Sequence, residues 1–140
     1  MKFNLLPTTT VEQSNRLLEY GVKPETADGY YEEDGHVIIA RDDYDLEVAL
    51  HYRHLPPAWS LSRLIEMFPR EVPDKKDGFE PHHPELIIHN SGYNLSIRRS
   101  TADCRVGTHI EKSPVECCVS MISWLIRNGY FNKEYLNEKL

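Results

Sequence analysis

Several residues in this chain have side chains suited to metal binding. The chain has 140 residues and seven histidines. A group of three histidines and two glutamates falls in or just after a proline-rich stretch: Glu80, His82, His83, Glu85 and His89. Imidazole nitrogens and carboxylate oxygens are ordinary zinc ligands, so His82, His83 and His89 form a candidate metal site. Their spacing matches no zinc motif with a structural rationale, and solvated surface histidines are the competing interpretation.

The most distinctive chemical feature is an acidic stretch. Residues 25–47 contain nine acidic side chains and one basic one, a net charge of −8, whereas the whole chain carries −6. The carboxylates expected to form a binding surface are Glu32, Glu33, Asp34, Asp42 and Asp43. Such a surface suits a basic partner, a divalent cation at Asp42, Asp43 and Asp45, or mimicry of nucleic-acid charge. Acids on an exposed hairpin also simply discourage aggregation between strands.

The three cysteines form no recognisable motif. Cys104 stands apart, and Cys117 and Cys118 are adjacent, which makes neither a zinc-type pair nor a disulfide framework. Cys118 falls on the apolar face of a predicted helix and is expected in the core. Cys117 is expected to be partly exposed near the helix N-terminus, where a thiolate is stabilised. No histidine or acid is tied to it by sequence, so a structural role in a reduced, cytoplasmic protein is favoured.

Several classes of function are disfavoured. The chain contains no Walker-type glycine run, no Gly-x-Gly-x-x-Gly and no Gly-x-Ser-x-Gly, so nothing specifies phosphate binding or a serine hydrolase. The negative net charge argues against nucleic acid or an anionic membrane as the main partner. No apolar run is long enough to cross a bilayer, and no secretion signal is recognisable. A basic stretch at Arg98, Arg99 and Arg105 keeps nucleic-acid contact as a minor alternative.

The acidic stretch is predicted to lie on strands. Tyr30-Tyr31 and Val37-Ile38-Ile39 flank Asp34-Gly35, which is a strong signal for a hairpin. A second turn is predicted at Asp42-Asp43. From residue 44 to residue 52 apolar side chains occupy every second position, which predicts a half-buried strand.

This predicted strand bears on two further residues with metal-binding side chains. On a strand, His51 and His54 point to opposite faces, so they are not expected to share a ligand. Pro56-Pro57 is predicted to end the sheet.

Three main helices are predicted from their caps and apolar faces. The first starts at a capping box on Thr9 or Thr10, buries Val11, Leu17 and Leu18, and ends near Tyr20, before Gly21. The second is capped by Ser60 and ends at Pro69. The third combines Ser113 as N-cap with Pro114 and Glu116, and it ends at Asn128-Gly129. A short last helix is predicted over Lys133 to Lys139.

The remaining strands decide the fold class. Residues 86–88 and 93–97 predict a second hairpin, and Val106 to Ile110 predicts one more strand, after a surface loop from Arg70 to Pro84. Tight turns imply antiparallel pairing. The sequence therefore predicts an α+β fold, an antiparallel sheet built from hairpins with about three helices packed on it, in a single domain of residues 1–140. The halves 29–68 and 86–129 hint at a duplicated unit, which no residue-level repeat supports.

Two segments carry a resemblance to known sequences. They are Pro57 to Pro69 and Ser113 through Phe131. Both resemble small proteins encoded by phages, prophages and mobile elements of Bacteroides-like bacteria, a group with no assigned activity. The resemblance implies an intracellular accessory protein and carries over no catalytic residue.

We therefore hypothesise a non-enzymatic protein-interaction module that uses the acidic surface around residues 25–47. Another protein is the expected partner, with no cofactor and no membrane, and the module is expected as a monomer or a homodimer. The alternative is a metal-binding protein or a small hydrolase-like enzyme that uses residues 80–89.

Overall fold

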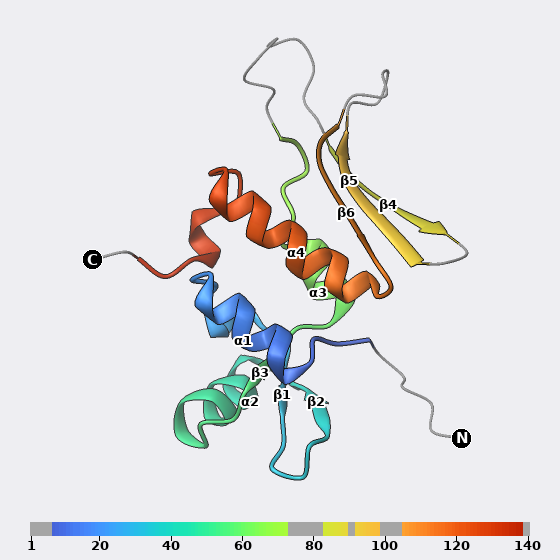
Figure 1. Ribbon diagram of the computed structural model, residues 1–140. Helices are drawn as coiled ribbons and strands as arrows, with labels where there is room; N and C mark the ends of the chain where they lie inside the picture. The colour runs from blue at the N-terminus through green and yellow to red at the C-terminus, as the bar shows by residue number, and fades with distance from the viewer. Residues whose placement is uncertain (1–6, 73–82, 90–91, 99–104, 139–140) are drawn as a thin grey trace. The chain divides into compact units, whose positions relative to one another are not determined.

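The computed structural model describes residues 7–72, 83–89, 92–98 and 105–138 (Figure 1). For some residues of the last three strands only the backbone is described. The chain divides into two compact units: Met1–Glu66 with Lys133–Leu140, and Met67–Asn132. The predicted α+β class is confirmed, and the antiparallel strands are distributed over two three-stranded sheets.

The first unit contains a sheet of strand order β2-β1-β3. The hairpin predicted around Asp34-Gly35 is confirmed, since β1 (Gly29–Tyr31) pairs antiparallel with β2 (Val37–Ile39). Its loop is closed by the N–H of Glu32, which donates to the backbone oxygen of His36 at 2.8 Å. Gly35 adopts φ 88°, a left-handed conformation that glycine accepts without strain.

The prediction that Pro56-Pro57 ends the sheet is wrong. Pro57–Ala58 is β3, and it pairs with β1 on the side opposite β2. The N–H of Tyr31 donates to the Pro56 oxygen at 2.9 Å. Hydrogen-bonded positions alternate along an antiparallel pair, so the nitrogen of Pro57 faces away from β1 and its missing N–H removes no bond.

The strand predicted over residues 44–52 is also wrong, because this segment is helical. It forms α2 (Asp43–Glu47), which continues as the π-helical turn η2 (Val48–Tyr52). The predicted turn at Asp42-Asp43 is the start of this helix, where the Asp42 carboxylate accepts from the N–H of Asp45 at 2.7 Å.

The buried residues of this helix explain why the alternation of apolar residues wrongly predicted a strand. Leu46, Ala49 and Leu50 are buried, and their spacing of three and four places them on one helical face. Tyr44 and Tyr52, which produced the alternating pattern, are each 74% exposed. Ala49 and Leu50 pack with Tyr30 and Leu55 in the core beside β1.

The other helices of this unit start as predicted. In α1 (Val11–Glu19), Thr10 and Gln13 form the capping box. Gly21, at φ 96°, ends α1, and the N–H of Val22 bonds back to the Leu17 oxygen at 3.1 Å. The predicted burial of Val11 is wrong, because its side chain is 40% exposed.

The remaining helical segments of this unit are short. Helix α3 (Leu61–Glu66) is capped by Ser60, as predicted, and ends before the predicted end at Pro69. Residues Pro24–Thr26 form the 3₁₀ turn η1. Lys133–Tyr135 form the 3₁₀ turn η3 in place of the longer predicted last helix.

Trp59 is the centre of a buried polar network in the first unit. Its ring is fully buried, and its Nε1–H donates to the Thr26 hydroxyl at 3.0 Å. Its backbone N–H donates to the Thr9 hydroxyl at 3.0 Å, and Thr9 shares a hydrogen bond of 2.7 Å with Ser14. These bonds hold the start of α1 against the end of β3.

The second unit is a sheet of order β4-β5-β6 with one long helix. Its strands are β4 (His83–His89), β5 (Gly92–Arg98) and β6 (Arg105–Glu111), which confirms the second hairpin and the further strand. Gly92 is required there, because a Cβ at this position would lie 2.6 Å from the Glu111 oxygen.

Helix α4 (Pro114–Arg127) packs against β5 and β6 (Figure 1). Its N-cap, Ser113, accepts from the N–H of Glu116 at 3.3 Å, as predicted. The predicted partial exposure of Cys117 is wrong. Both Cys117 and Cys118 are fully buried, and the Cys117 thiol donates to the Tyr93 oxygen at 3.4 Å.

Candidate functional site

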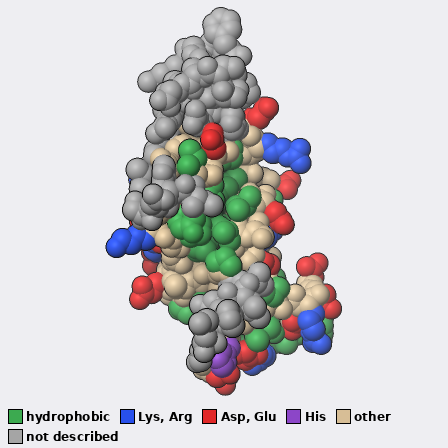
Figure 2. All heavy atoms as spheres, turned by 90° about the vertical axis from the view of Figure 1, so that its right-hand side faces the viewer, with side chains coloured by type: hydrophobic (Ala, Val, Ile, Leu, Met, Phe, Trp, Pro, Cys, Tyr) green, Lys and Arg blue, Asp and Glu red, His purple; other side chains and the backbone are tan. Residues whose placement is uncertain are grey.

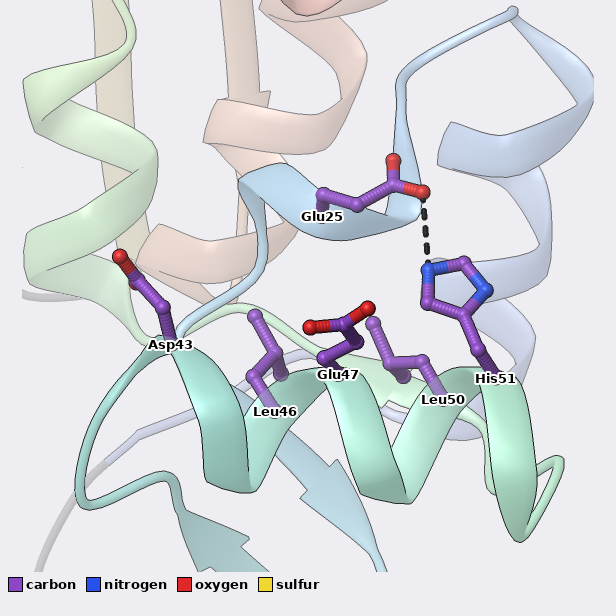
Figure 3. Close-up of a pocket in the computed structure, with 6 residues that line it drawn as sticks. All are labelled: Glu25, Asp43, Leu46, Glu47, Leu50 and His51. Carbon is purple, nitrogen blue, oxygen red and sulfur yellow. Dashed lines mark ion pairs between the residues drawn. The ribbon is translucent and has the colours of Figure 1, made fainter.

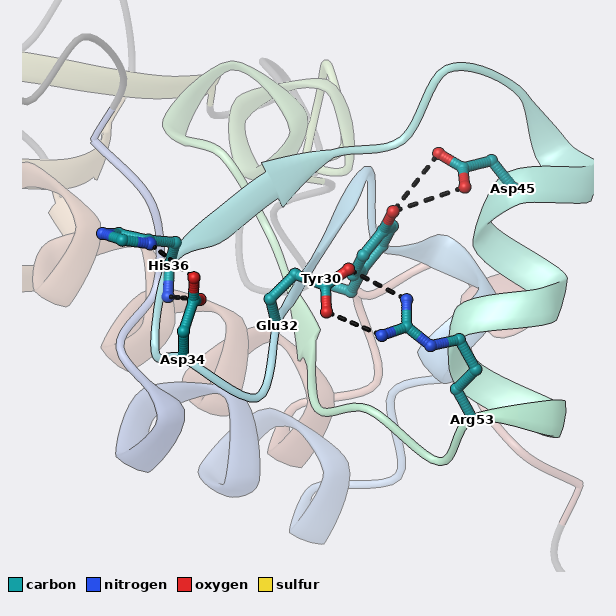
Figure 4. A network of polar contacts seen from close by, with 6 residues as sticks. All are labelled: Tyr30, Glu32, Asp34, His36, Asp45 and Arg53. Carbon is teal, nitrogen blue, oxygen red and sulfur yellow. Dashed lines mark hydrogen bonds and ion pairs between the residues drawn. The ribbon is translucent and has the colours of Figure 1, made fainter.

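The acidic stretch runs from η1 through the β1–β2 hairpin to α2, within the first unit (Figure 4). Some of its carboxylates bond within the fold, some line surface pockets, and Glu25, Asp28 and Asp42 do both. Glu32 belongs to the first group. Both of its oxygens accept from Arg53, Oε1 from Nη1 at 2.9 Å and Oε2 from Nη2 at 2.7 Å. These hydrogen bonds lower the pKa of Glu32, so it stays charged at neutral pH.

Asp34 also has a structural role. One of its oxygens accepts from the backbone N–H of His36 at 3.0 Å, and the other lies 2.9 Å from His36 Nδ1. The backbone hydrogen bond is the main cause of a lowered pKa at Asp34. This carboxylate therefore shapes the hairpin loop.

Asp45 connects the hairpin to α2. Its carboxylate accepts from the Tyr30 hydroxyl at 3.3 Å (Figure 4). It also accepts from the backbone N–H of Arg41 at 3.0 Å. Burial and the nearby Asp45 charge raise the pKa of Tyr30, so its hydroxyl stays a donor.

The cation site considered at Asp42, Asp43 and Asp45 finds no support in this geometry. The carboxylates of Asp42 and Asp45 are used to start α2 and to hold Tyr30. Among the described residues, no three histidine, cysteine or acidic side chains are grouped so that they could hold a metal ion.

A surface pocket of about 370 Å³ lies along α2 and η2 (Figure 3). Leu46 and Leu50 point into it from the helix, and Glu25 approaches from η1. Asp43 and Glu47 also line the pocket. His51 closes one end, where its Nε2 lies 3.0 Å from the Glu25 carboxylate. The pocket thus has an apolar base and an acidic rim.

A second pocket of about 380 Å³ adjoins the first, since both are lined by Glu25, Asp43 and Leu46. Ile39, the last residue of β2, also lines it, together with Asp28 and Asp42. We call these two pockets the acidic groove. Its lining residues are Glu25, Ala27, Asp28, Ile39, Ala40, Asp42, Asp43, Leu46, Glu47, Leu50, His51 and Arg63.

Two members of the groove are held by bonds of their own. Asp28 accepts from the N–H and the hydroxyl of Ser60. Arg63 donates from Nε to the Thr26 oxygen at 2.7 Å and from Nη1 to Glu66 at 3.2 Å. The groove therefore carries five carboxylates with Arg63 as its one permanently charged cation.

The structure brings together only part of the predicted binding residues. Asp42 and Asp43 line the groove, whereas Glu32 and Asp34 bond within and beside the hairpin loop, and Glu33 is exposed there. The sequence did not predict Glu25 and Asp28 as groove residues, because only the tertiary structure places them beside α2.

The candidate metal site at residues 80–89 stays a hypothesis from the sequence. His82 lies outside the described residues, and His83 and His89 are described only as the backbone ends of β4. Of the basic stretch, Arg99 lies outside the described residues, and the backbones of Arg98 and Arg105 pair across β5 and β6.

The fold and the groove define a small α+β protein with an acidic surface groove. No protein-family model, curated protein or solved structure matches the chain. In the part of the chain that is described, no helix is both long enough and apolar enough to cross a membrane.

Proposed function

We propose that this protein is an accessory interaction module, without an enzymatic activity, that binds a basic region of another protein through the acidic surface of residues 25–47. The observation that carries the proposal is a concentration of exposed apolar side chains within this acidic stretch and just after it. Of the six large hydrophobic side chains that are exposed among the described residues, four lie here: Ile38, Ile39, Tyr44 and Tyr52.

Exposed apolar groups within a field of one charge are typical of a binding surface. Tyrosine is among the residues that contribute most of the free energy at protein interfaces, and surrounding charges speed association and select partners. Figure 2 shows acidic, basic and histidine side chains together with hydrophobic ones at the lower end of one face, at the height where Figure 1 places the β1–β2 hairpin. Exposed apolar groups mark an interaction site where they gather into one patch rimmed by polar residues.

The sign of the charge indicates the chemistry of the partner. Residues 25–47 carry a net charge of −8. Among the described residues, the carboxylates of Glu33 and Asp43 accept no hydrogen bond. The charge of Glu33 acts on Arg53, whose pKa it helps to raise, and Asp43 lines the pocket, so both carboxylates are available to a ligand. Lysine and arginine side chains match this surface, because their aliphatic stems can cover the exposed Ile39 while their cationic ends meet the carboxylates.

Binding of labelled synthetic peptides to the full chain tests the proposal. The probes are peptides rich in lysine and valine, matched peptides with glutamate in place of lysine, and matched peptides with serine in place of valine. Fluorescence anisotropy should detect binding of the lysine-valine peptides, weaker binding of the lysine-serine peptides, and none of the glutamate peptides. Binding should weaken as salt is added.

A charge-matched pair of variants locates the surface. Glu33→Gln with Asp43→Asn should weaken binding, whereas Glu12→Gln with Glu19→Gln, two exposed acids of α1, should leave it unchanged. The proposal fails if no lysine-valine peptide binds, or if both double variants bind as well as the natural chain.

A further inference from the structure

The outer edge of β2 has the properties of a site for strand pairing. β2 lies at one end of its sheet, and no strand in the described part of the chain pairs with its outer side. Edge strands are often protected by short length, by charged residues, by proline or by a bulge. β2, which is Val37-Ile38-Ile39, is short, but it contains no charged residue and no proline, and its register to β1 is continuous.

The hydrogen bonds of the hairpin show which groups face outward. The N–H of Ala40 donates to the Asp28 oxygen at 2.9 Å, which makes position 40 a hydrogen-bonded position. Such positions alternate with non-hydrogen-bonded ones along an antiparallel pair. Ile38 therefore bonds to β1, whereas Val37 and Ile39 direct their N–H and C=O groups away from the sheet.

The opposite edge of the same sheet is protected. At β3 the outward position is Pro57, which has no N–H to offer. The chain then continues into an isolated antiparallel bridge between Thr8 and Ser60. The contrast leaves β2 as the edge of this sheet that can accept a further strand.

The charges around β2 identify the strand that would fit. Ile39 lines the acidic groove beside Asp42 and Asp43, and the hairpin loop at the other end of β2 contains Glu33 and Asp34. The outward backbone groups thus lie between two groups of carboxylates. An extended segment with aliphatic residues in the middle and lysine or arginine at both ends complements this arrangement.

We infer that the outer edge of β2 is the docking site for an extended basic segment of another protein, which adds to the β2-β1-β3 sheet as a fourth strand. This inference rests on the proposed function and specifies its binding mode. A second copy of the chain is the poorer occupant, because pairing β2 with β2 brings together two segments that each carry −8.

Alternate N-methylation of a peptide tests the strand pairing directly. A strand that adds to one edge uses the N–H groups of every second residue, and the others point away. The probe is a peptide of about seven residues with valine and threonine in the middle and lysine at both ends. Two N-methylated versions are made, one at the odd positions and one at the even positions. One should bind like the parent. The affinity of the other should be lower by a factor of about ten or more.

A change in the protein gives an independent measurement. Ile39→Pro removes an outward N–H and no bond to β1, so it should weaken binding of the parent peptide about tenfold. Ile39→Val keeps the N–H and removes only one methylene group from the groove, so it should weaken binding much less than Ile39→Pro does. Circular dichroism and thermal unfolding show whether Ile39→Pro is folded, and the N-methylated peptides give a result even if it is not.

The outcomes separate this inference from the proposed function. Equal binding of the two N-methylated peptides overturns strand pairing while the proposed function survives. Loss of binding by all peptides, the parent included, contradicts both. The chain without peptide could also form a dimer that binds no peptide until it dissociates. This result would show that a second copy occupies the edge, and it would overturn the inference.

Discussion

The guanidinium of Arg53 binds the Glu32 carboxylate with both of its terminal nitrogens, at 2.9 and 2.7 Å. Arg53 directly follows η2, and Glu32 begins the loop between β1 and β2. This pair therefore joins the helical half of the acidic surface to the hairpin half. It also shows that some of the acids in this stretch support the fold, which leaves Glu33 and Asp43 as better candidates for binding.

The Glu32–Arg53 pair should make stability depend on pH. The folded protein lowers the pKa of Glu32 because Arg53 bonds to its charged form. The stabilisation is fully present above the ordinary glutamate pKa of about 4.3 and is lost as the pH falls through the lowered value. Glu32→Gln should lower the melting temperature at neutral pH and flatten its fall on acidification.

Thermal unfolding of both forms across the acidic pH range checks this. Arg53→Lys is the matched variant, since it keeps the charge and loses the two-point contact. Its melting temperature should lie between those of the natural chain and Glu32→Gln. The pKa of Asp34 is also lowered, but this residue is present in both proteins and contributes equally to both pH profiles. If the melting temperatures of the natural chain and Glu32→Gln fell in parallel on acidification, the prediction would be contradicted.

The capping box of α1 should contribute measurably to stability. Thr10→Ala removes the hydroxyl that accepts from the N–H of Gln13 at 3.1 Å. We expect a loss of about 1 kcal/mol in the free energy of unfolding, measured by urea denaturation. Thr10→Ser keeps the acceptor and should lose only a small part of this. Similar losses in both variants would mean that the hydroxyl is not the cause.

The buried hydroxyl of Thr9 should contribute measurably to the free energy of unfolding. Thr9→Val keeps the shape of the side chain but leaves the backbone N–H of Trp59 and the hydroxyl of Ser14 without this partner. A buried group that loses its partner costs roughly 1 to 3 kcal/mol. Urea denaturation of Thr9→Val should show this loss, and Thr9→Ser should show less. A Thr9→Val protein as stable as the natural chain would exclude the network as a source of stability.

Two tyrosines distinguish a helix from a strand over residues 43–52. On α2 and η2, Tyr44 and Tyr52 are 74% exposed, so Tyr44→Ser and Tyr52→Ser should each change the free energy of unfolding by no more than about 0.5 kcal/mol. If they faced the core of a sheet, each change would cost about 3 kcal/mol or more. Asp42→Ala, which removes the N-cap, should by contrast cost about 1 kcal/mol.

The two adjacent thiols of α4 should be unreactive in the folded protein. Burial raises the pKa of Cys117, and it raises the pKa of Cys118 to about 12, so neither forms a thiolate near neutral pH. Iodoacetamide should modify both only after unfolding, as measured by mass spectrometry of the digested protein. Fast modification of Cys117 in the native state would contradict its buried position.

The helix starts and the hairpins were predictable because their causes are local. Thr10 with Gln13 and Ser113 with Glu116 satisfy backbone groups within one turn, and Gly35 accepts its conformation whatever surrounds it. Side-chain and backbone preferences over a few residues are enough to specify such features.

The prediction of a strand over residues 44–52 was wrong because the segment contains two periodicities. Its apolar residues match both the alternation of a strand and the spacing of a helix, and the choice depends on which of them find a core. Leu46, Ala49 and Leu50 pack beside Tyr30 and Leu55, so the helix is formed. A sequence scan could have detected the helix from the N-cap at Asp42.

The sequence by itself determined the α+β class, the main helix starts, the two hairpins and the acidic stretch, because each depends on neighbouring residues or on composition. Only the tertiary structure decided which acids line the groove and which edge of the first sheet is open. Those properties depend on residues far apart in the chain, such as Glu25 over α2 and Pro57 beside β1, which packing alone brings together.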